Sequence, residues 1–180
     1  MNFQEIIEPI ILECELKFVE RSKPISEEEA RLRIEPSVRR VSKIISILKE
    51  LRVSERPAKG LEIGAGYGAL IFPLAKLFPS IEWFGIEHPQ RRYLRNPQYL
   101  EMLERFGIRL VSCDLTEGTL PFKDESFDVV TFSEVLEHLP MESITFVLSE
   151  LHRVTQRGGG NLGYISEFSV FAQQGLDPHG

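Results

Sequence analysis

Cysteine is scarce in this sequence, in which Cys14 and Cys113 are the only 2 cysteines and lie far apart. Two cysteines are too few for a disulfide framework, and they do not have the spacing of metal ligands. We therefore expect both to be reduced thiols in a cytoplasmic protein. The N-terminus carries Glu5 and Glu8 where a secretory signal would have basic residues, so no export signal is expected.

Long apolar runs and an excess of positive charge are also missing. No apolar run approaches the roughly 20 residues that a membrane span needs, so no membrane partner is expected. The net charge of −6 argues against a surface built wholly for nucleic acid, although it allows a local basic patch. With 42% apolar and 27% charged residues, the chain has the profile of a soluble globular protein with one sizeable core.

Residues 1–58 are predicted to form a helical extension or lid beside the main domain. Ser26 followed by Glu29 is a capping box at a helix start, and Pro36 is expected to break the chain. Apolar side chains recur at helical steps on both sides of Pro36 and need a surface to pack on. They are Ile6, Ile7, Ile10, Ile11, Cys14 and Phe18, and then Val38, Val41, Ile44, Ile45, Leu48 and Leu51.

Charge divides sharply within this extension. Residues 1–30 hold eight acidic and three basic residues, whereas residues 31–59 hold nine basic and three acidic ones. We interpret the basic stretch as a solvated helix face that pairs with the acidic helix before it. A site for an anionic substrate is the alternative.

From residue 59 to residue 180 the pattern predicts one α/β domain of alternating strands and helices. Strands separated by helices imply a mostly parallel sheet with helices on both faces. The predicted strands are Lys59–Gly64, Ile81–Ile86, Ile108–Cys113, Phe127–Ser133 and Asn161–Ser166. The predicted helices are Tyr67–Phe78, Pro97–Phe106 with Gly107 as its stop, and Met141–Thr155.

A glycine-rich segment, LEIGAGYG at residues 61–68, joins the first strand to the first helix of this domain. Glycine allows a sharp turn and a close approach of the backbone to a ligand, and free amides at a helix start bind polar groups. Glu87 ends the second strand, about 20 residues later, where a carboxylate accepts hydrogen bonds from ribose hydroxyls. Without a ligand the segment would be only a tight turn, and Glu87 a surface acid.

The glycine spacing departs from that of nicotinamide-binding domains. Gly68 follows Gly66 after two residues rather than three, and Glu62 stands two residues before Gly64. A nicotinamide oxidoreductase is therefore the weakest of the alternatives.

The run from Glu62 to Gly68 resembles the first motif of class I, Rossmann-like S-adenosylmethionine-dependent methyltransferases. Glu87 and Cys113-Asp114-Leu115 match two further motif positions. Leu120–Asp128, followed by Phe132–Leu139, is similar to the fourth-strand region of the small-molecule branch, methyltransferase types 11 and 12. The resemblance covers residues 60 to about 167 and implies S-adenosyl-L-methionine as cofactor and a small-molecule methyl acceptor.

The resemblance also implies roles for individual residues. The backbone at Gly64 and Gly66 would face the methionine part of the cofactor, Glu87 would hold the ribose, and Asp114 with the Leu115 amide would meet adenine. Asp114 could instead cap a turn. The full set of implied cofactor-binding residues is Glu62, Gly64, Ala65, Gly66, Tyr67, Gly68, Glu87, His88, Asp114, Leu115, Ser133 and Glu134.

Catalysis is expected to need few residues, because an activated methyl group mainly requires alignment of donor and acceptor and exclusion of water. Ser133 and Glu134 would lie near the sulfonium. His138 and Glu134 are the catalytic candidates, since a general base helps a hydroxyl acceptor. In a helix, Glu134, Glu137 and His138 would share one face and could bind a divalent cation, so no metal is predicted but this alternative is kept. Asp128 is expected to support the start of a strand.

The chain departs from the family after its fifth strand. Relatives have seven strands, whereas few residues follow here, so we expect a sheet that stops after about five strands. Its edge would be covered by the N-terminal helices, the tail or a second copy in a homodimer; failing that, the chain would be a fragment. A cofactor-binding domain without turnover is thus the main alternative to an active enzyme. An RNA methyltransferase is less favoured, because no Asn-Pro-Pro-Tyr motif follows the fourth strand.

Overall fold

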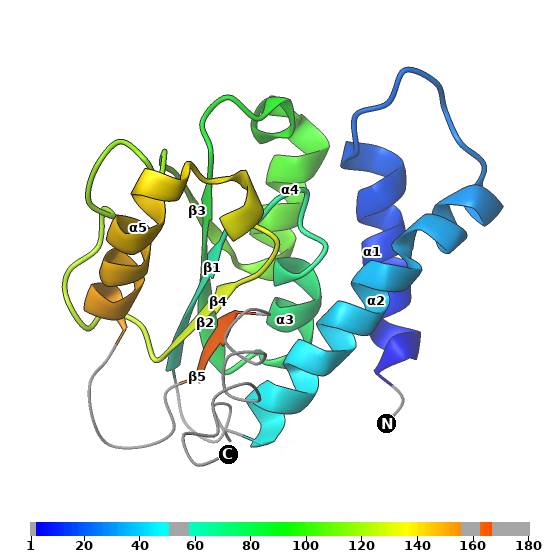
Figure 1. Ribbon diagram of the computed structural model, residues 1–180. Helices are drawn as coiled ribbons and strands as arrows, with labels where there is room; N and C mark the ends of the chain where they lie inside the picture. The colour runs from blue at the N-terminus through cyan, green and yellow to red at the C-terminus, as the bar shows by residue number, and fades with distance from the viewer. Residues whose placement is uncertain (1–2, 51–57, 156–162, 167–180) are drawn as a thin grey trace, which may run out of the picture.

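The computed structural model describes residues 3–50, 58–155 and 163–166, and these form a five-stranded sheet with helices on both faces (Figure 1). The strands are β1 (Ala58–Ile63), β2 (Ile81–Glu87), β3 (Arg109–Ser112), β4 (Val129–Phe132) and β5 (Gly163–Ser166). The helices are α1 (Gln4–Phe18), α2 (Glu27–Glu50), α3 (Ile71–Leu77), α4 (Pro97–Phe106) and α5 (Met141–Val154), with short 3₁₀ helices η2 (Arg92–Arg95) and η3 (Leu136–His138). The predicted Rossmann-like α/β fold is confirmed.

The sheet has the order β3-β2-β1-β4-β5, and every pairing between the strands described is parallel. The chain leaves β1 toward β2 and β3 on one side and later returns to β4 on the other, so the strand order reverses beside β1. Ligands of parallel sheets bind at the carboxyl ends of the strands at such a reversal. Asp128 supports the start of β4, as expected, because it is hydrogen-bonded twice to Lys59 of β1. Its Oδ2 accepts from the Lys59 amide at 2.8 Å, and its own amide donates to Lys59 O at 2.9 Å.

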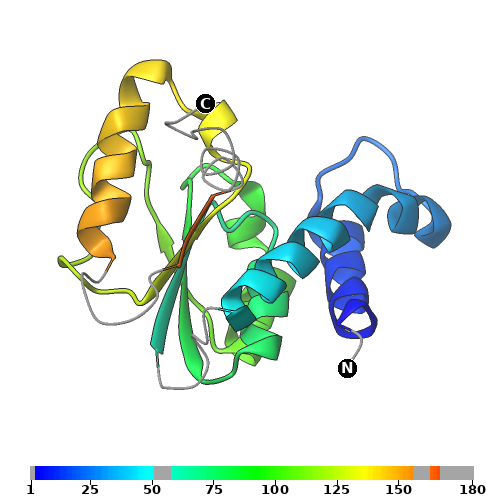
Figure 2. The ribbon, with the colours of Figure 1, turned by 60° about the horizontal axis from the view of Figure 1, so that its bottom comes forward.

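Two apolar clusters fill the space on the two faces of the sheet. One joins α1, α2, α3 and α4, and it contains Phe72, Trp83 and Tyr99. The other packs α5 against the opposite face through Val147, Leu151 and Val154. Figure 2 shows the same division, with α5 on one side of the sheet and the remaining helices on the other.

The N-terminal helices share their core with the sheet domain. The apolar stripe of α2 is buried in the same cluster as Ile71 and Leu74 of α3, and burial of each large apolar side chain contributes about 1.5–3 kcal/mol. Helix α2 also contacts β5, which is one edge of the sheet described. Of the three segments expected to cover this edge, the N-terminal helices therefore do contact it. The division into 1–58 and 59–180 stays a prediction, and Leu51 lies outside the described residues.

Pro36 does not break the chain, contrary to the sequence-based expectation, because α2 runs through it from Glu27 to Glu50. A proline inside a helix leaves the carbonyl four residues earlier, here that of Leu32, without its amide donor. Both Pro36 and Leu32 are exposed, so a water molecule can donate a hydrogen bond to the Leu32 carbonyl. Half of the predicted capping box is present: the Glu29 amide donates to Ser26 Oγ at 3.1 Å, while the Glu29 carboxylate pairs with Arg33.

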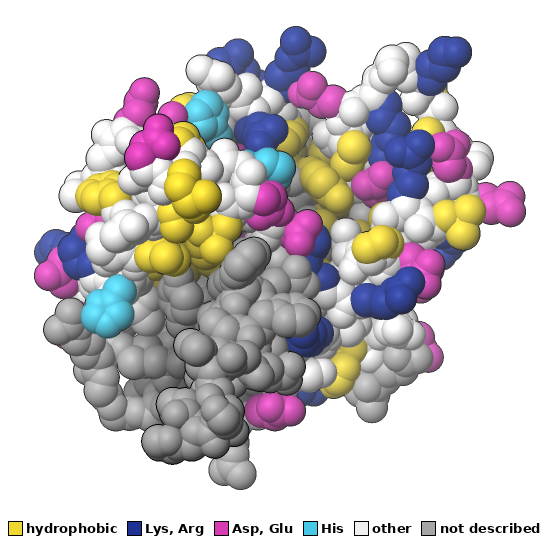
Figure 3. Space-filling view, viewed as in Figure 1, with side chains coloured by type: hydrophobic (Ala, Val, Ile, Leu, Met, Phe, Trp, Pro, Cys, Tyr) yellow, Lys and Arg dark blue, Asp and Glu magenta, His cyan; other side chains and the backbone are white. Residues whose placement is uncertain are grey.

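Three of the six basic residues of α2 form ion pairs with acids of α1 or of α2 itself. Arg31 Nη1 lies 2.6 Å from Glu8 Oε1 of α1, which is the predicted pairing with the acidic helix. Within α2, further ion pairs join Arg31 to Glu27, Arg33 to Glu29 and Arg39 to Glu35. Figure 3 accordingly shows Lys and Arg side chains interspersed with acids over these helices. Arg52 and Arg56 lie outside the described residues.

The first helix of the sheet domain is shorter than predicted, whereas the second matches. Helix α3 begins at Ile71 rather than Tyr67, because Gly68 has a φ of 95°, which a right-handed helix cannot contain. Helix α4 spans the predicted Pro97–Phe106 and ends at Gly107 in the left-handed conformation.

Candidate functional site

The turn after β1 depends on glycine at three positions. Gly64, Gly66 and Gly68 have φ values of 71°, 56° and 95°. A Cβ on Gly64 would lie 2.5 Å from Val135 Cγ2, and one on Gly68 would lie 2.0 Å from Phe72 Cε2. Above Gly66, by contrast, the nearest atom to a Cβ would be 3.8 Å away. Side chains therefore pack against the turn at Gly64 and Gly68, whereas the backbone at Gly66 is accessible.

Four amides of this turn are already bonded within the protein, so these four are not the free donors that the sequence suggested. The Gly64 and Ala65 amides both donate to Ile86 O at 2.9 Å, and the Gly68 amide donates to Ala65 O at 3.0 Å. The Gly66 amide donates to Glu87 Oε2 at 2.6 Å. What the turn offers a ligand is a bare backbone surface.

Glu87 lies at the end of β2, beside the turn, as predicted. Its side chain is only 6% exposed, and its Oε1 accepts from the His88 amide at 2.7 Å. Tyr93 of η2 donates to the same carboxylate. Burial, and then the nearby Glu87 carboxylate, raise the pKa of the Tyr93 phenol. A carboxylate has about four acceptor positions, so three donors leave capacity for another hydroxyl.

Tyr99 of α4 supports the turn from the side of the apolar core, and no motif in the sequence indicated this role. Its hydroxyl donates to Gly66 O at 2.9 Å, and its ring packs edge-on against Phe18 and Phe72. The apolar core and the turn are thus joined through one fully buried side chain.

Asp114 and His88 are brought together between the ends of β2 and β3. His88 Nε2 lies 3.2 Å from Asp114 Oδ2, while Asp114 Oδ1 accepts from the amide and hydroxyl of Thr116. These Thr116 bonds, with that of His88, hold the pKa of Asp114 below its ordinary value. Asp114 therefore does cap a turn, and this leaves its predicted adenine contact untested. Leu115 is buried in the second apolar cluster.

The segment after β4 is not one helix, so Glu134, Glu137 and His138 do not share a helical face. Glu134 has a φ of 56°, and η3 begins only at Leu136. The side chains of Glu134, Glu137 and His138 are all exposed. Across residues 3–50, 58–155 and 163–166, no three His, Cys, Asp or Glu side chains are placed to hold a metal ion. Non-glycine residues with positive φ are uncommon and often mark functional sites.

Three buried polar groups near the turn have no hydrogen-bond partner: Glu62 Oε2, Ser133 Oγ and Arg40 Nε. Burial raises the pKa of Glu62 well above its ordinary value, while the Arg40 guanidinium opposes that shift. Arg40 Nη1 also lies 3.4 Å from Glu134 Oε2. Unpaired buried polar atoms are costly, so their presence here fits a polar ligand beside the turn. Arg40 was not predicted, because nothing in its local sequence places it here.

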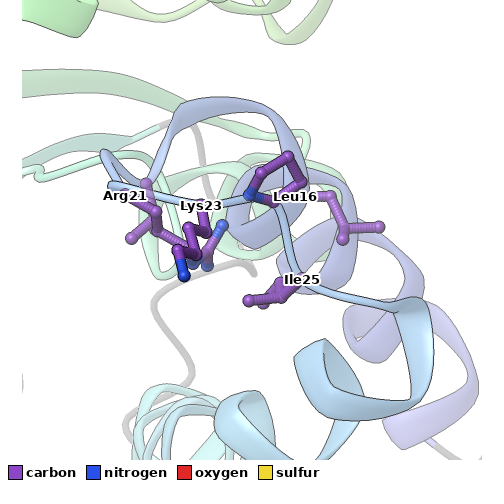
Figure 4. Close-up of a pocket in the computed structure, with 6 residues that line it drawn as sticks. Leu16, Arg21, Lys23 and Ile25 are labelled. Atoms are coloured by element: carbon purple, nitrogen blue, oxygen red, sulfur yellow. The ribbon is translucent and has the colours of Figure 1, made fainter.

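Two surface hollows lie elsewhere. One of about 280 Å³ is lined by residues at the connection from α1 to α2, among them Leu16, Arg21, Lys23 and Ile25 (Figure 4). The other, of about 550 Å³, is lined by Glu20, Arg21, Ser22 and Arg92. No predicted site residue lines either hollow.

A glycine turn at the reversal point of a parallel sheet, with a buried carboxylate ending the next strand, is typical of a Rossmann-like domain. Residues 61–161 match the family model for the methyltransferase domain. This match covers more than half of the chain, which therefore belongs to that family, a class I small-molecule methyltransferase family as its motifs predicted.

Known relatives agree with this assignment. An uncharacterised methyltransferase of Schizosaccharomyces pombe is 30% identical over 113 residues, which are 61% of this chain and 40% of that protein. A candidate sarcosine dimethylglycine methyltransferase from Galdieria sulphuraria superposes with a TM-score of 0.56 at 25% identity, over 74% of this chain and 47% of its own. This chain thus spans less than half the length of either relative.

A third likeness concerns the fold alone. Coclaurine N-methyltransferase, in a structure bound to N-methylheliamine and SAH, has a TM-score of 0.54 at 15% identity, over 84% of this chain and 42% of its own. Among the helices described here, none is both long and apolar enough to cross a membrane.

Proposed function

We propose that this chain binds S-adenosyl-L-methionine at the turn after β1 and transfers its methyl group to a small-molecule acceptor. The observation that carries the proposal is the bond from the Gly66 amide to Glu87 Oε2, which joins the bare glycine turn to a buried carboxylate one strand away. The bound cofactor would supply an activated methyl group on a sulfonium. The protein's task is then to align donor and acceptor and to exclude water.

The residues present fit such a cofactor. Glu87 would accept a ribose hydroxyl at its remaining acceptor position, and the unobstructed space above Gly66 lets a ligand approach the backbone. Glu62 Oε2 and Ser133 Oγ are buried polar atoms without partners, as expected for groups that await a polar ligand. Asp114 and the Leu115 amide would meet adenine, with His88 holding the Asp114 carboxylate in place.

Glu134 and His138 are our candidates for the acceptor side. Both follow β4 and are exposed, so an acceptor could reach either one. His138 would orient the acceptor or remove its proton. Glu134 precedes Val135, whose side chain packs against Gly64 of the turn. The chain's 2 free cysteines suit the cytoplasmic location we infer, and pairing of a second copy along the sheet edge stays a prediction.

Calorimetry with S-adenosylhomocysteine, followed by methyl-transfer assays on small amines, phenols and carboxylic acids, tests the proposal. Binding in the micromolar range with transfer to one acceptor class supports it, and no binding of the thioether or the sulfonium refutes it. Binding without any turnover would favour a cofactor-binding domain that acts as a partner subunit. Strongly salt-dependent RNA binding would favour an RNA substrate, which the internally paired basic residues of α2 argue against.

A further inference from the structure

Gly66 is held in place by hydrogen bonds and not by packing. The nearest atom to a Cβ built on it would be 3.8 Å away, whereas at the other two glycines of the turn side chains would lie 2.5 Å and 2.0 Å away. The Gly66 amide donates to Glu87 Oε2 at 2.6 Å, and the Gly66 carbonyl accepts from the Tyr99 hydroxyl at 2.9 Å. The position of Gly66 in the turn therefore depends on these two bonds.

The Tyr99 side chain is itself held on several sides by aromatic rings. It is fully buried, and its ring centroid lies 5.2 Å from that of Phe18 of α1, 5.9 Å from that of Phe72 of α3 and 5.2 Å from that of Tyr93 of η2. Burial raises the pKa of the Tyr99 phenol, so its hydroxyl stays protonated and donates. A phenylalanine ring would make the same ring contacts, so what the hydroxyl adds is its bond to Gly66.

The neighbouring tyrosine bonds to the other partner of Gly66. Tyr93 donates to the Glu87 carboxylate, and its ring lies against that of Tyr99. The hydrogen bond between Gly66 and Glu87 is thus supported at each end by one of two adjacent tyrosines. Of about four acceptor positions on the carboxylate, the Gly66 amide, the His88 amide and Tyr93 occupy three, so one position remains.

We propose that Tyr99, together with Tyr93, is a positioning residue for ribose recognition, because the two hydroxyls hold Gly66 and Glu87 relative to each other. The inference rests on the proposed function, in which Glu87 accepts a ribose hydroxyl. Hydrogen bonds to a carboxylate are strong but depend steeply on distance and angle. Loss of a tyrosine hydroxyl should therefore weaken this one contact and spare the rest of the cofactor.

The same arrangement gives the N-terminal helix α1 a part in the site. Phe18, near the end of α1, packs edge-on against Tyr99, with an angle of 84° between the ring planes. The helix thus supports the glycine turn through the Tyr99 ring, without a contact of its own to the cofactor being needed.

The test combines two ligands with variants that each remove one hydroxyl. S-adenosylhomocysteine carries both ribose hydroxyls, and its dideoxyribose analogue lacks both. Calorimetry with each ligand is carried out on the wild type, on Tyr99→Phe and on Thr155→Val. Thr155 is the matched control, because its buried hydroxyl donates to Leu151 O at 2.6 Å directly after α5, which packs on the opposite face of the sheet. Proton–nitrogen NMR of the ligand-free proteins follows the Gly66 amide, whose short bond to a carboxylate shifts its proton resonance downfield.

We expect Tyr99→Phe to move the Gly66 resonance upfield. It should weaken S-adenosylhomocysteine binding by roughly 3- to 20-fold and leave binding of the analogue within about twofold of wild type. Thr155→Val should change neither the resonance nor the two affinities.

An unmoved Gly66 resonance, or equal weakening of both ligands, would overturn the inference while leaving the proposed cofactor intact. A wild type that binds both ligands equally would overturn it too, since no ribose hydroxyl would then be recognised. A wild type that binds neither ligand would instead overturn the proposed function, and the inference with it.

Tyr93→Phe covers loss of folding in Tyr99→Phe. It keeps a ring beside Tyr99 but removes the donor to Glu87, so it should also weaken S-adenosylhomocysteine more than the analogue. An equal change for both ligands would contradict the role of the two tyrosines. The melting temperature of each variant, measured without ligand, verifies that folding is retained.

Discussion

The backbone amide of Gly66 donates to Glu87 Oε2 at 2.6 Å, so the turn after β1 and the end of β2 are held as one unit. This bond connects a backbone segment without side chains to a carboxylate that is only 6% exposed. This bond sets the position of the Glu87 acceptor oxygens relative to the bare backbone, on which the proposed cofactor site depends.

Glu87→Gln should weaken binding of S-adenosylhomocysteine by roughly 10- to 100-fold, because a charged acceptor of the ribose hydroxyls is replaced by a neutral amide. Calorimetry at pH 7 measures the change. Glu82→Gln is the matched control, since Glu82 lies on the same strand and pairs with Arg109 at 2.9 Å. Equal affinities for the Glu87 variant and the wild type would remove Glu87 from the site.

Gly64→Ala should cost roughly 3–4 kcal/mol of unfolding free energy, from left-handed strain and from overpacking against Val135. Gly107→Ala, with a similar φ of 66° but nothing within 4 Å of the new Cβ, should cost only about 1–2 kcal/mol. Urea denaturation of the two variants compares them. Val135→Ala should recover part of the Gly64→Ala loss; similar costs at the two glycines would contradict the clash.

Arg153→Met should destabilise the protein by about 2–3 kcal/mol, because Arg153 joins α5 to the segment before β4. It donates to Leu120 O at 3.1 Å, to Phe122 O at 2.9 Å and to Glu150 Oε2 at 2.7 Å. Arg33→Met, which removes an exposed ion pair in α2, should change stability by less than about 0.5 kcal/mol. Thermal and urea denaturation of both variants measures the difference; comparable losses would disprove the role of Arg153.

Glu150 should contribute fully to stability only above its ordinary carboxyl pKa, and progressively less below it. The Arg153 side chain, and then the Leu120 amide, hold the pKa of Glu150 below 4.5 in the folded protein. The folded pKa is the lower one, so this stabilisation is complete above about pH 5 and is lost as the pH falls through 4.5 and below. Unfolding free energies at pH 7, 5, 4 and 3 should therefore fall less steeply for Glu150→Gln than for wild type. Parallel pH curves would contradict the assignment.

Much of the fold was predictable because its signals are local. Gly107 ends α4 where the sequence placed the stop, and Ser26 caps α2 through Glu29 three residues on. The alternation of strands and helices likewise predicted the parallel sheet. Pro36 shows the limit of such signals, because an exposed proline is accommodated in a helix that is held by its buried face.

The site was predictable only in part. The glycine turn and Glu87 are fixed by their places at the ends of two adjacent strands. The spacing of Glu134 and His138 suggested one helical face, yet the chain turns through a left-handed residue before η3 begins. No sequence motif indicates Arg40 or Tyr99. Arg40 reaches Glu134, and Tyr99 reaches Gly66, only because their helices pack on the sheet.

The sequence by itself determined the methyltransferase fold, the turn and the carboxylate beside it, because helix caps, glycine conformations and strand alternation act over a few residues. Only the tertiary structure decided that four amides of the turn are bonded internally and that α2 carries Arg40 to the vicinity of Glu134. Those outcomes depend on how distant segments pack together, and packing is set by the shape of whole apolar faces rather than by any short run of residues.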